Sequence, residues 1–444
     1  MNEKQYIDLC REHRELLERN SAACLNRGRE EAAEWLECHG LPTRRHESYL
    51  YCPLMEEMGR DYGVNVARVK FPVNPHDVFK CNVPGIHANV YFIVNDQFYA
   101  NSHPELGGGA VFCSMKTAEE RFPEIVGCYA GRLTDDREDA FVAMNRMLAQ
   151  DGYFLYVPKG VKVELPVQVV NIMRSDVDYM ATAHNLIVVE EGAEVTALVC
   201  DHTIDRVSFF ANRMTEAYVG HGAHLRYYTM ESSHDTMNNL NQLYVKQEGD
   251  SEFTMCTVGL HNGKTRNYTE VYLDGEGAAA TLGGMLISDG AQHSENQTLI
   301  YHNAPRCTSN ELFKYILDEQ SEGVFAGRTI VKEGAQKTVA QQTNRNICLT
   351  REAHMWAKPQ LEIYADDVKC GHGATTGQLD EQAMFYMRTR GIGETEARML
   401  LLMAFTADVI DLVEFEALRE RIRALVEKRL RGEAAHCEGC RTVR

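Results

Sequence analysis

The alternation of apolar and polar residues divides the chain into a helical beginning, a long β region and a helical end. In residues 3–40, apolar side chains recur three, seven and eight positions apart among charged ones, which predicts a pair of amphipathic helices that ends at Gly40. Segments 89–94 and 97–100 predict a β-hairpin, and residues 136–150 predict another helix. The first 150 residues are therefore expected to be helical and mixed.

The segment from about 153 to 375 has a different pattern, with short β-prone runs and no long helical period. A polar-Gly-small corner recurs along it, and the first three gaps between these glycines are 30, 27 and 28 residues. Such a period predicts a β-solenoid, since glycine takes the positive φ of a tight corner without strain. Two β-sandwich domains would give similar strands without the repeated corner. The corners are Glu191-Gly192-Ala193, His221-Gly222-Ala223, Glu248-Gly249-Asp250, Glu276-Gly277-Ala278, Asp289-Gly290-Ala291 and Glu333-Gly334-Ala335.

The last part of the chain predicts three helices, over 380–390, 394–413 and 415–430. Their apolar side chains exceed what one small helical pair buries, so part of this surface should pack on the β region. The remainder is either internal core or a docking face for another protein. These apolar residues are Met384, Phe385, Met387, Met399, Leu400, Leu401, Leu402, Met403 and Phe405.

These patterns define four predicted parts. They are a helical and mixed region (1–150), a β-helix core (151–378), a helical domain (379–432) and a mobile Cys/His tail (433–444). The predicted fold class is mainly β, with a parallel β-helix core between helical flanks.

Composition limits the function. The 444 residues carry a formal net charge of −18, which argues against nucleic-acid binding. Fourteen cysteines are scattered without a signal peptide, which favours a reduced, cytoplasmic protein with mostly buried thiols. The most apolar run, 399–413, contains two aspartates and is too short to cross a bilayer. We therefore expect a cytoplasmic protein with no membrane partner.

No common catalytic motif is present in the sequence. The run Gly107-Gly108-Gly109 is not followed by Lys-Ser/Thr, so it predicts a flexible loop and no nucleotide site. Nucleophile-elbow, zinc-protease and dinucleotide-binding patterns are also missing from the sequence. We expect a protein that is not itself an enzyme, with any ATP-driven step supplied by a partner.

Two clusters contain residues that bind soft metals. Cys370 and His372 lie between a β-prone run and a helix, and residues two apart on an extended segment point to the same face. Two ligands do not complete a tetrahedral site, so a partner chain or a transient site would supply the rest. The second cluster is His436, Cys437 and Cys440 in the tail, where no second C-x-x-C completes a zinc site. Each cluster is also compatible with a purely structural or incidental role.

The stretch from Lys358 to Ile392, KPQLEIYADDVKCGHGATTGQLDEQAMFYMRTRGI, resembles the C-terminal signature of the SufB/SufD family. The glycine after His372 and the following G-Q-L-D are similar to SufD rather than SufB. Further similar stretches, in the same order as in the family, cover most of the chain. They are Leu41-Pro42-Thr43-Arg44-Arg45, Asp151-Gly152 with Tyr156 to Val161, Ala335-Gln336-Lys337-Thr338 and Gln342-Thr343-Asn344-Arg345-Asn346.

The resemblance implies a right-handed parallel β-helix and a role in assembling iron–sulfur clusters. SufD-like chains pair with SufB through their β-helices and bind the ABC-type ATPase SufC through their C-terminal helices. A transient cluster would form near the SufB–SufD interface, where His372 matches the implicated histidine and Cys370 is its neighbour. The resemblance leaves open a flavin in the assembled complex, a homodimer of the isolated chain, and a ligand or proton-transfer role for His372.

Two alternatives follow from the same sequence. A SufB-type scaffold would hold a cluster by itself, which the scattered cysteines allow. A β-helix enzyme acting on a polysaccharide would need a basic groove, which the negative charge disfavours.

Overall fold

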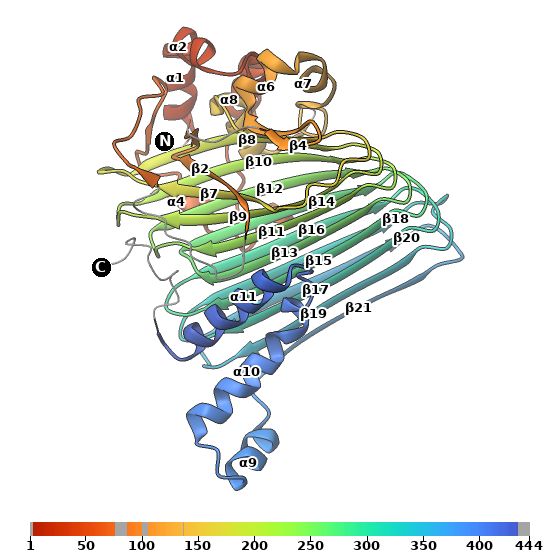
Figure 1. The fold of residues 1–444 in the computed structure, drawn as a ribbon. Coiled ribbons are helices and arrows are strands. Elements are labelled where there is room, and N and C mark those ends of the chain that lie inside the picture. Colours follow the sequence, from red (N-terminus) through yellow and green to blue (C-terminus); the bar gives the residue numbers. More distant parts are fainter. Residues whose placement is uncertain (1–2, 76–86, 100–104, 136, 434–444) are drawn as a thin grey trace.

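The computed structural model describes residues 3–75, 87–99, 105–135 and 137–433. The chain forms a parallel β-solenoid of about 8 turns, with helices at its N-terminal and C-terminal ends (Figure 1). The predicted β-helix architecture with helical flanks is therefore confirmed. The predicted domain boundaries remain predictions.

Two parallel sheets face each other across the solenoid. Within the described residues, the first sheet has 11 strands in the order β20-β18-β16-β14-β12-β10-β8-β6-β5-β4, with β1 beside β8. The second has 10 strands in the order β21-β19-β17-β15-β13-β11-β9-β7-β2-β3. The first sheet's strands are β1 (Gly63–Val64), β4 (Glu105–Gly107), β5 (Ala110–Ser114), β6 (Tyr153–Val157), β8 (Tyr179–Val189), β10 (Phe209–Val219), β12 (Met237–Gln247), β14 (Lys264–Leu273), β16 (His293–His302), β18 (Glu322–Val331) and β20 (His354–Ile363). The second sheet's strands are β2 (Asn89–Val94), β3 (Gln97–Phe98), β7 (Val167–Met173), β9 (Glu194–Thr203), β11 (His224–Ser232), β13 (Glu252–His261), β15 (Ala279–Ser288), β17 (Thr308–Leu317), β19 (Val339–Cys348) and β21 (Lys369–Gly377).

Each turn of the solenoid places one strand in each sheet, in unbroken parallel register over most of its length. Because side chains alternate across a strand, one set fills the space between the sheets and the other faces outward. The inward set includes Val245, Val271 and Phe313, which belong to one continuous apolar cluster along the solenoid. Burial of these side chains is the main stabilising contribution to stacking one turn on the next.

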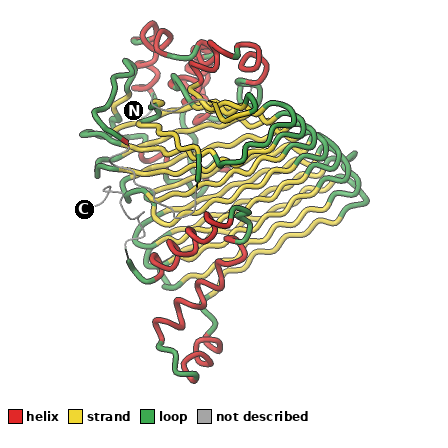
Figure 2. The backbone as a smooth tube through the Cα atoms, in the orientation of Figure 1, coloured by secondary structure: helices red, strands yellow, loops and turns green. Residues whose placement is uncertain are grey.

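The corners lie on both edges of the solenoid (Figure 2). Five of the six predicted corners connect a strand of the first sheet to one of the second. The corner at 289–291 instead connects β15 to β16 on the opposite edge, so it does not belong to the same series. The sequence pattern detected the turns but could not assign them to an edge, since both edges use the same polar-Gly-small chemistry.

Glycine is not required at every corner, which corrects the expectation from sequence. Gly192 and Gly222 have positive φ, of 65° and 61°. At other corners a residue with a side chain takes this conformation, as Asp250 (φ 52°), Arg306 (φ 59°) and Lys337 (φ 63°) do. A single left-handed residue costs about 1–2 kcal/mol, which the pairing of the adjoining strands offsets.

The N-terminal end of the solenoid is closed by two antiparallel hairpins, β2–β3 and β4–β5. The first confirms the hairpin predicted around Asn95 and Asp96. Gly107, Gly108 and Gly109 all have positive φ in the tight connection between β4 and β5. These glycines were predicted to form a flexible loop, and the structure corrects this to a hairpin turn, because the strands on both sides pair with each other.

The N-terminal helices pack on the outer face of the first sheet, where Phe141 stacks on Phe210 within an apolar cluster that also contains Leu240. These helices are α1 (Lys4–Glu12), α2 (Arg14–Asn20), α3 (Arg29–His39), α4 (Leu54–Glu57), α6 (Met115–Arg121), α7 (Pro123–Tyr129) and α8 (Ala140–Leu148), with 3-10 turns η1 (Ala23–Asn26) and η2 (Glu47–Tyr49). The predicted helix over 136–150 thus begins later, at Ala140, since the Asp139 side chain accepts hydrogen bonds from the first helical N–H groups.

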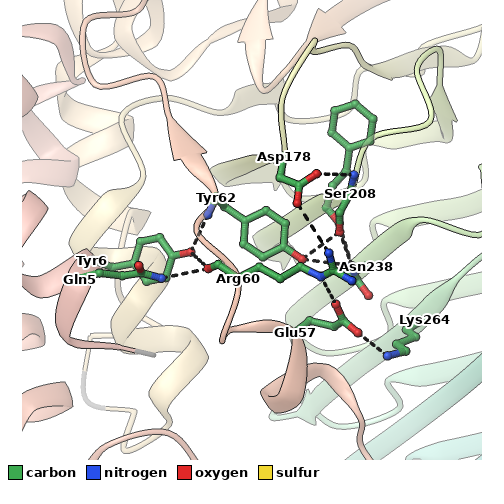
Figure 3. Close-up of polar contacts among 10 residues, drawn as sticks. Gln5, Tyr6, Glu57, Arg60, Tyr62, Asp178, Ser208, Asn238 and Lys264 are labelled. Atoms are coloured by element: carbon green, nitrogen blue, oxygen red, sulfur yellow. Dashed lines mark hydrogen bonds and ion pairs between the residues drawn. The ribbon is translucent and has the colours of Figure 1, made fainter. Parts of the chain in front are cut away.

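A polar network fastens this region to one edge of the solenoid (Figure 3). The Tyr6 hydroxyl donates to the carbonyl of Arg60 at 3.1 Å. Glu57 accepts from Arg60 at 2.9 Å and also pairs with Lys264 of β14. Tyr62 bonds Ser208 at 3.1 Å. Residues far apart in sequence are thereby joined across the first sheet.

The C-terminal helices are α9 (Glu381–Thr389), α10 (Glu394–Ile410) and α11 (Glu416–Leu430). Helices α10 and α11 pack on the outer face of the second sheet, and α9 projects past the last turn (Figure 1). The Lys314 ammonium of β17 donates to the carbonyl of Phe405 and to Asp408, both at 2.7 Å. Arg429 donates to the carbonyl of Leu260 at 2.7 Å. The expected packing of these helices on the β region is present.

Eleven cysteines lie in the described residues, and all are free thiols. Six of them are buried, including Cys52 and Cys256, while Cys38 and Cys128 are exposed. No helix in the described part of the chain is long and apolar enough to cross a membrane. The predicted tail cluster of His436, Cys437 and Cys440 lies outside the described residues.

Candidate functional site

Cys370 and His372 lie on β21, the last strand of the second sheet. In the described structure, β20 and β21 have no strand on their far sides, so the solenoid ends there with two open edges. Helix α9 begins four residues after β21, where the Asp380 side chain accepts from the N–H groups of Gln382 and Ala383. The two residues therefore occupy the junction between the β and helical regions that the sequence predicted.

The strand register places both side chains on the inner face of the sheet. Cys370 pairs with Ala340 and His372 with Gln342 of β19, and both of these β19 residues are buried between the sheets. Gln342 in turn pairs with Glu311 of β17. Glu311, Gln342 and His372 thus form one column that runs from the interior to the open end. The structure therefore puts the two predicted site residues on one face.

Asparagines of the preceding strand hold β21 in place. The Asn346 side chain donates to the carbonyl of Thr375 at 3.1 Å and to the hydroxyl of Thr376 at 3.2 Å. Asn344 donates to the carbonyl of Phe313 at 3.2 Å and to the side chain of Asn346 at 3.1 Å. The polar sequence from Gln342 to Asn346 therefore fastens the last strand, which fixes the position of His372.

The two candidate ligands have different surroundings. Cys370 is half-buried against an apolar cluster that contains Val331, Ala335 and Ala365. Burial raises the pKa of the Cys370 thiol, which leaves less of the thiolate that binds metals. His372 is exposed at the open end. Its imidazole is the more accessible ligand, because it meets solvent without movement of the chain.

The glycines around His372 lie in an extended strand and form no sharp turn, although glycine is the residue that most readily allows one. Gly371, Gly373 and Gly377 lie in extended β21 without positive φ. A Cβ at Gly373 or Gly377 would meet nothing within 4 Å. By alternation these three positions face outward, so this side of β21 has little side-chain cover. Another backbone can therefore approach this side of β21 closely, as is common where glycine lies within a strand.

Among the described residues, no three His, Cys, Asp or Glu side chains are grouped closely enough to hold a metal ion. Cys370 and His372 therefore remain a pair of candidate ligands.

A second candidate surface is the apolar side of α9. Phe385 and Tyr386 have 71% and 58% of their area exposed, and Leu400 of α10 has 40%. No residue of α9 is buried. The sequence left open whether the apolar side chains of these helices form internal core or an exposed docking face. Leu402 and Val409 belong to the core, whereas α9 keeps exposed aromatic side chains.

Sequence reasoning missed Glu311, although the solenoid period could have located it. One turn before His372 is position 342, and 31 residues before that is position 311, as the register gives. Counting back by a turn of about 30 residues from a candidate ligand is the signal that would have identified this column.

Comparisons with known proteins found two family models and several relatives that together cover most of the chain. Residues 1–169 match the family model described as the SufBD protein N-terminal region, and residues 172–405 match the one described as the SUF system FeS cluster assembly, SufBD core domain. An iron–sulfur cluster assembly SufBD family protein of Synechocystis is 28% identical over 432 residues, covering 94% of this chain and 90% of that protein. The iron–sulfur cluster assembly protein SufD of Escherichia coli is 26% identical over 400 residues, covering 89% and 90%. The protein of that name from Bacillus subtilis is 27% identical over 332 residues, covering 73% and 74%.

Proposed function

The chain belongs to the SufBD family of iron–sulfur cluster assembly proteins, and from this premise we propose that it is the SufD-like, non-catalytic subunit of a cytoplasmic assembly complex. It pairs with a SufB-like chain and binds a SufC-like ABC ATPase. The iron–sulfur cluster is the cargo of this complex and is held only transiently. The observation that supports the proposal most directly is the position of His372, exposed at the open end of the solenoid.

The open end is suited to pairing with a second solenoid. The outer edges of β20 and β21 present unpaired backbone N–H and C=O groups, which can extend a sheet into another chain. In such a pair His372 lies next to the partner and supplies one ligand or one proton-transfer group, with Cys370 beside it. The partner supplies the remaining ligands, because a tetrahedral site needs more than two. Without SufB, the same edges allow a homodimer.

The first test is the yield of cluster from the complete complex carrying His372→Ala. We expect a strong loss, because the interface loses its imidazole. His354→Ala is the matched control, since His354 is exposed on β20 at the same open end but faces away from the interior. Undiminished yield from His372→Ala, or an equal loss from the control, would remove His372 from the mechanism.

The exposed aromatic side of α9 is the proposed docking face for the ATPase. Aromatic residues that are exposed in the free protein often become buried anchors of an interface. We expect a Phe385→Asp, Tyr386→Asp chain to fold and pair with SufB but to lose the ATPase on co-purification. Val177→Asp is the control, because Val177 is 64% exposed on the turn between β7 and β8. Retention of the ATPase by the double variant would exclude this face.

The SufB-type scaffold is the remaining alternative within the family. It predicts that the purified chain alone keeps a cluster after anaerobic reconstitution, whereas the SufD-like role predicts that it does not. The flavin left open by the resemblance has no part in this proposal.

A further inference from the structure

Glu311 is a buried acidic residue without a charged partner. It is fully buried on β17 and faces the interior of the solenoid. Among the described residues, neither of its carboxyl oxygens makes a hydrogen bond of good geometry, although the Thr298 and Gln342 side chains lie close enough to lower its pKa. Buried polar groups are normally satisfied, and an unpaired buried carboxylate is costly. Glu311 therefore requires an explanation that packing does not supply.

The surroundings of Glu311 favour its neutral form. Leu282 and Gln342 flank it in register within the second sheet, and Thr298 faces it from the first. No charged side chain is among the groups that shift its pKa, which burial raises to about 7. Another interior imidazole, His302, bonds the Ser309 hydroxyl at 2.8 Å and is kept neutral, because burial lowers its pKa to about 4. The carboxyl can thus exchange a proton near neutral pH.

The column of side chains connects Glu311 to the open end of the solenoid. Gln342 lies between Glu311 and His372, one strand from each. Two strand spacings of about 4.8 Å place the Cα atoms of Glu311 and His372 about 10 Å apart. The Gln342 amide donates to Thr329 at 2.8 Å while its oxygen has no partner. The column therefore has an unused acceptor beside a carboxyl that can carry a proton.

We propose that Glu311 is the buried acid–base group of the His372 site and that Gln342 links the two. The inference rests on the proposed role of His372 in cluster assembly. Metals bind neutral imidazoles and thiolates, so a ligand at the open end that still carries its proton must release it on binding. The Glu311 carboxylate takes up such a proton, becomes the neutral acid, and returns the proton to the ligand when the site empties. Glu311 is a positioning residue, since it does not touch the cluster.

The test compares two isosteric variants in the complete complex. Glu311→Gln removes the ionisation and keeps the shape. Glu231→Gln is the matched control, because Glu231 is also buried with its pKa raised by burial to about 7, but it hydrogen-bonds Thr265 of β14, far along the solenoid from β21. We expect Glu311→Gln to lower the initial rate of cluster formation about tenfold, the usual cost of removing a group that supports a ligand. The control should keep the wild-type rate.

The pH profile distinguishes an acid–base role from a structural one. The wild-type and Glu231→Gln complexes should show a change in rate near pH 7, and Glu311→Gln should not. The inference would be overturned if Glu311→Gln kept the change in rate near pH 7. It would also be overturned if the Glu231→Gln control lost that change. If Glu311→Gln does not fold, Gln342→Leu carries the test, and an unchanged rate there overturns the inference. His372→Ala, measured in parallel, separates the proposed role of His372 from that of Glu311. If His372→Ala has no effect on the rate, the proposed role of His372 is wrong, whatever the result for Glu311→Gln.

Discussion

Lys314 provides the sharpest test of how the C-terminal helices are held. Its side chain is only 5% exposed on the outer face of β17. The ammonium donates to the carbonyl of Phe405 and to Asp408 at 2.7 Å, and lies 4.7 Å from the centre of the Phe405 ring. Lys314→Met keeps the length and the apolar stem but removes all three interactions. It should therefore loosen α10 from the second sheet.

The size of the effect follows from the environment of each contact. A hydrogen bond to a charged group contributes about 1.5–3 kcal/mol. The bond to the Phe405 carbonyl is sheltered, whereas Asp408 is 51% exposed and its contribution is screened by solvent. We expect a net loss of about 2 kcal/mol, which makes local opening of α10 about 30-fold more frequent.

Hydrogen exchange measures this opening directly. Amides of α10 and α11 should exchange faster in Lys314→Met, while those of β8 to β12 should be unchanged. Lys246→Met is the control, because the Lys246–Asp274 pair is partly exposed at 3.5 Å and should contribute almost nothing. Equal exchange in the wild type and Lys314→Met would refute the claim that Lys314 anchors α10.

Three further predictions concern pH, close backbone contacts and thiols. The pKa of Glu231 is raised to about 7, so its protonation favours the folded state at low pH and this advantage is lost as pH rises to 7. The stability of the wild type relative to Glu231→Gln should thus fall by about 3 kcal/mol between pH 4.5 and 7 in urea denaturation. Gly152→Ala should prevent folding, as judged by circular dichroism, because the new Cβ would lie 1.9 Å from the carbonyl oxygen of His184. Gly107→Ala has free space around the new Cβ, so it should lower the free energy of unfolding by only about 1–2 kcal/mol, the cost of the positive φ. In native protein, Cys38 and Cys128 should react with a thiol reagent and Cys256, whose pKa burial raises to about 12, should not.

The architecture could be predicted from the sequence because the turns of the solenoid repeat. A corner recurring about every 30 residues indicates stacked turns, and the inward and outward alternation follows from strand geometry. The edge of each corner could not be predicted, because both edges use polar residues and glycine. The corner at Arg306 could not be predicted from the sequence, because a left-handed residue other than glycine leaves no recognisable pattern.

The candidate site was predictable only in part. The spacing of Cys370 and His372 placed them on one face, but their different burial depends on Val331 and Ala335, which come from another turn. The residues next to Glu311 in the sequence give no signal, since its place in the column with Gln342 and His372 arises from the register between turns. Properties of this kind come from the register between turns and not from neighbouring residues.

One strand brings the two proposed functions of the chain together. On β17, Glu311 faces the interior column that ends at His372, and Lys314, three residues later, faces outward and holds α10. Any movement of α10 that the proposed ATPase partner would cause acts first on the outer face of this strand. A packed sheet has little freedom to absorb such a movement, so the strand can shift only together with its neighbours. The inner face of the same strand carries the buried carboxyl of Glu311, whose protonation depends on its distance from Thr298 and Gln342. Docking at the helices and chemistry at the open end would then be coupled through β17, which requires Lys314→Met to alter the pH profile of cluster formation as well as the exchange of α10.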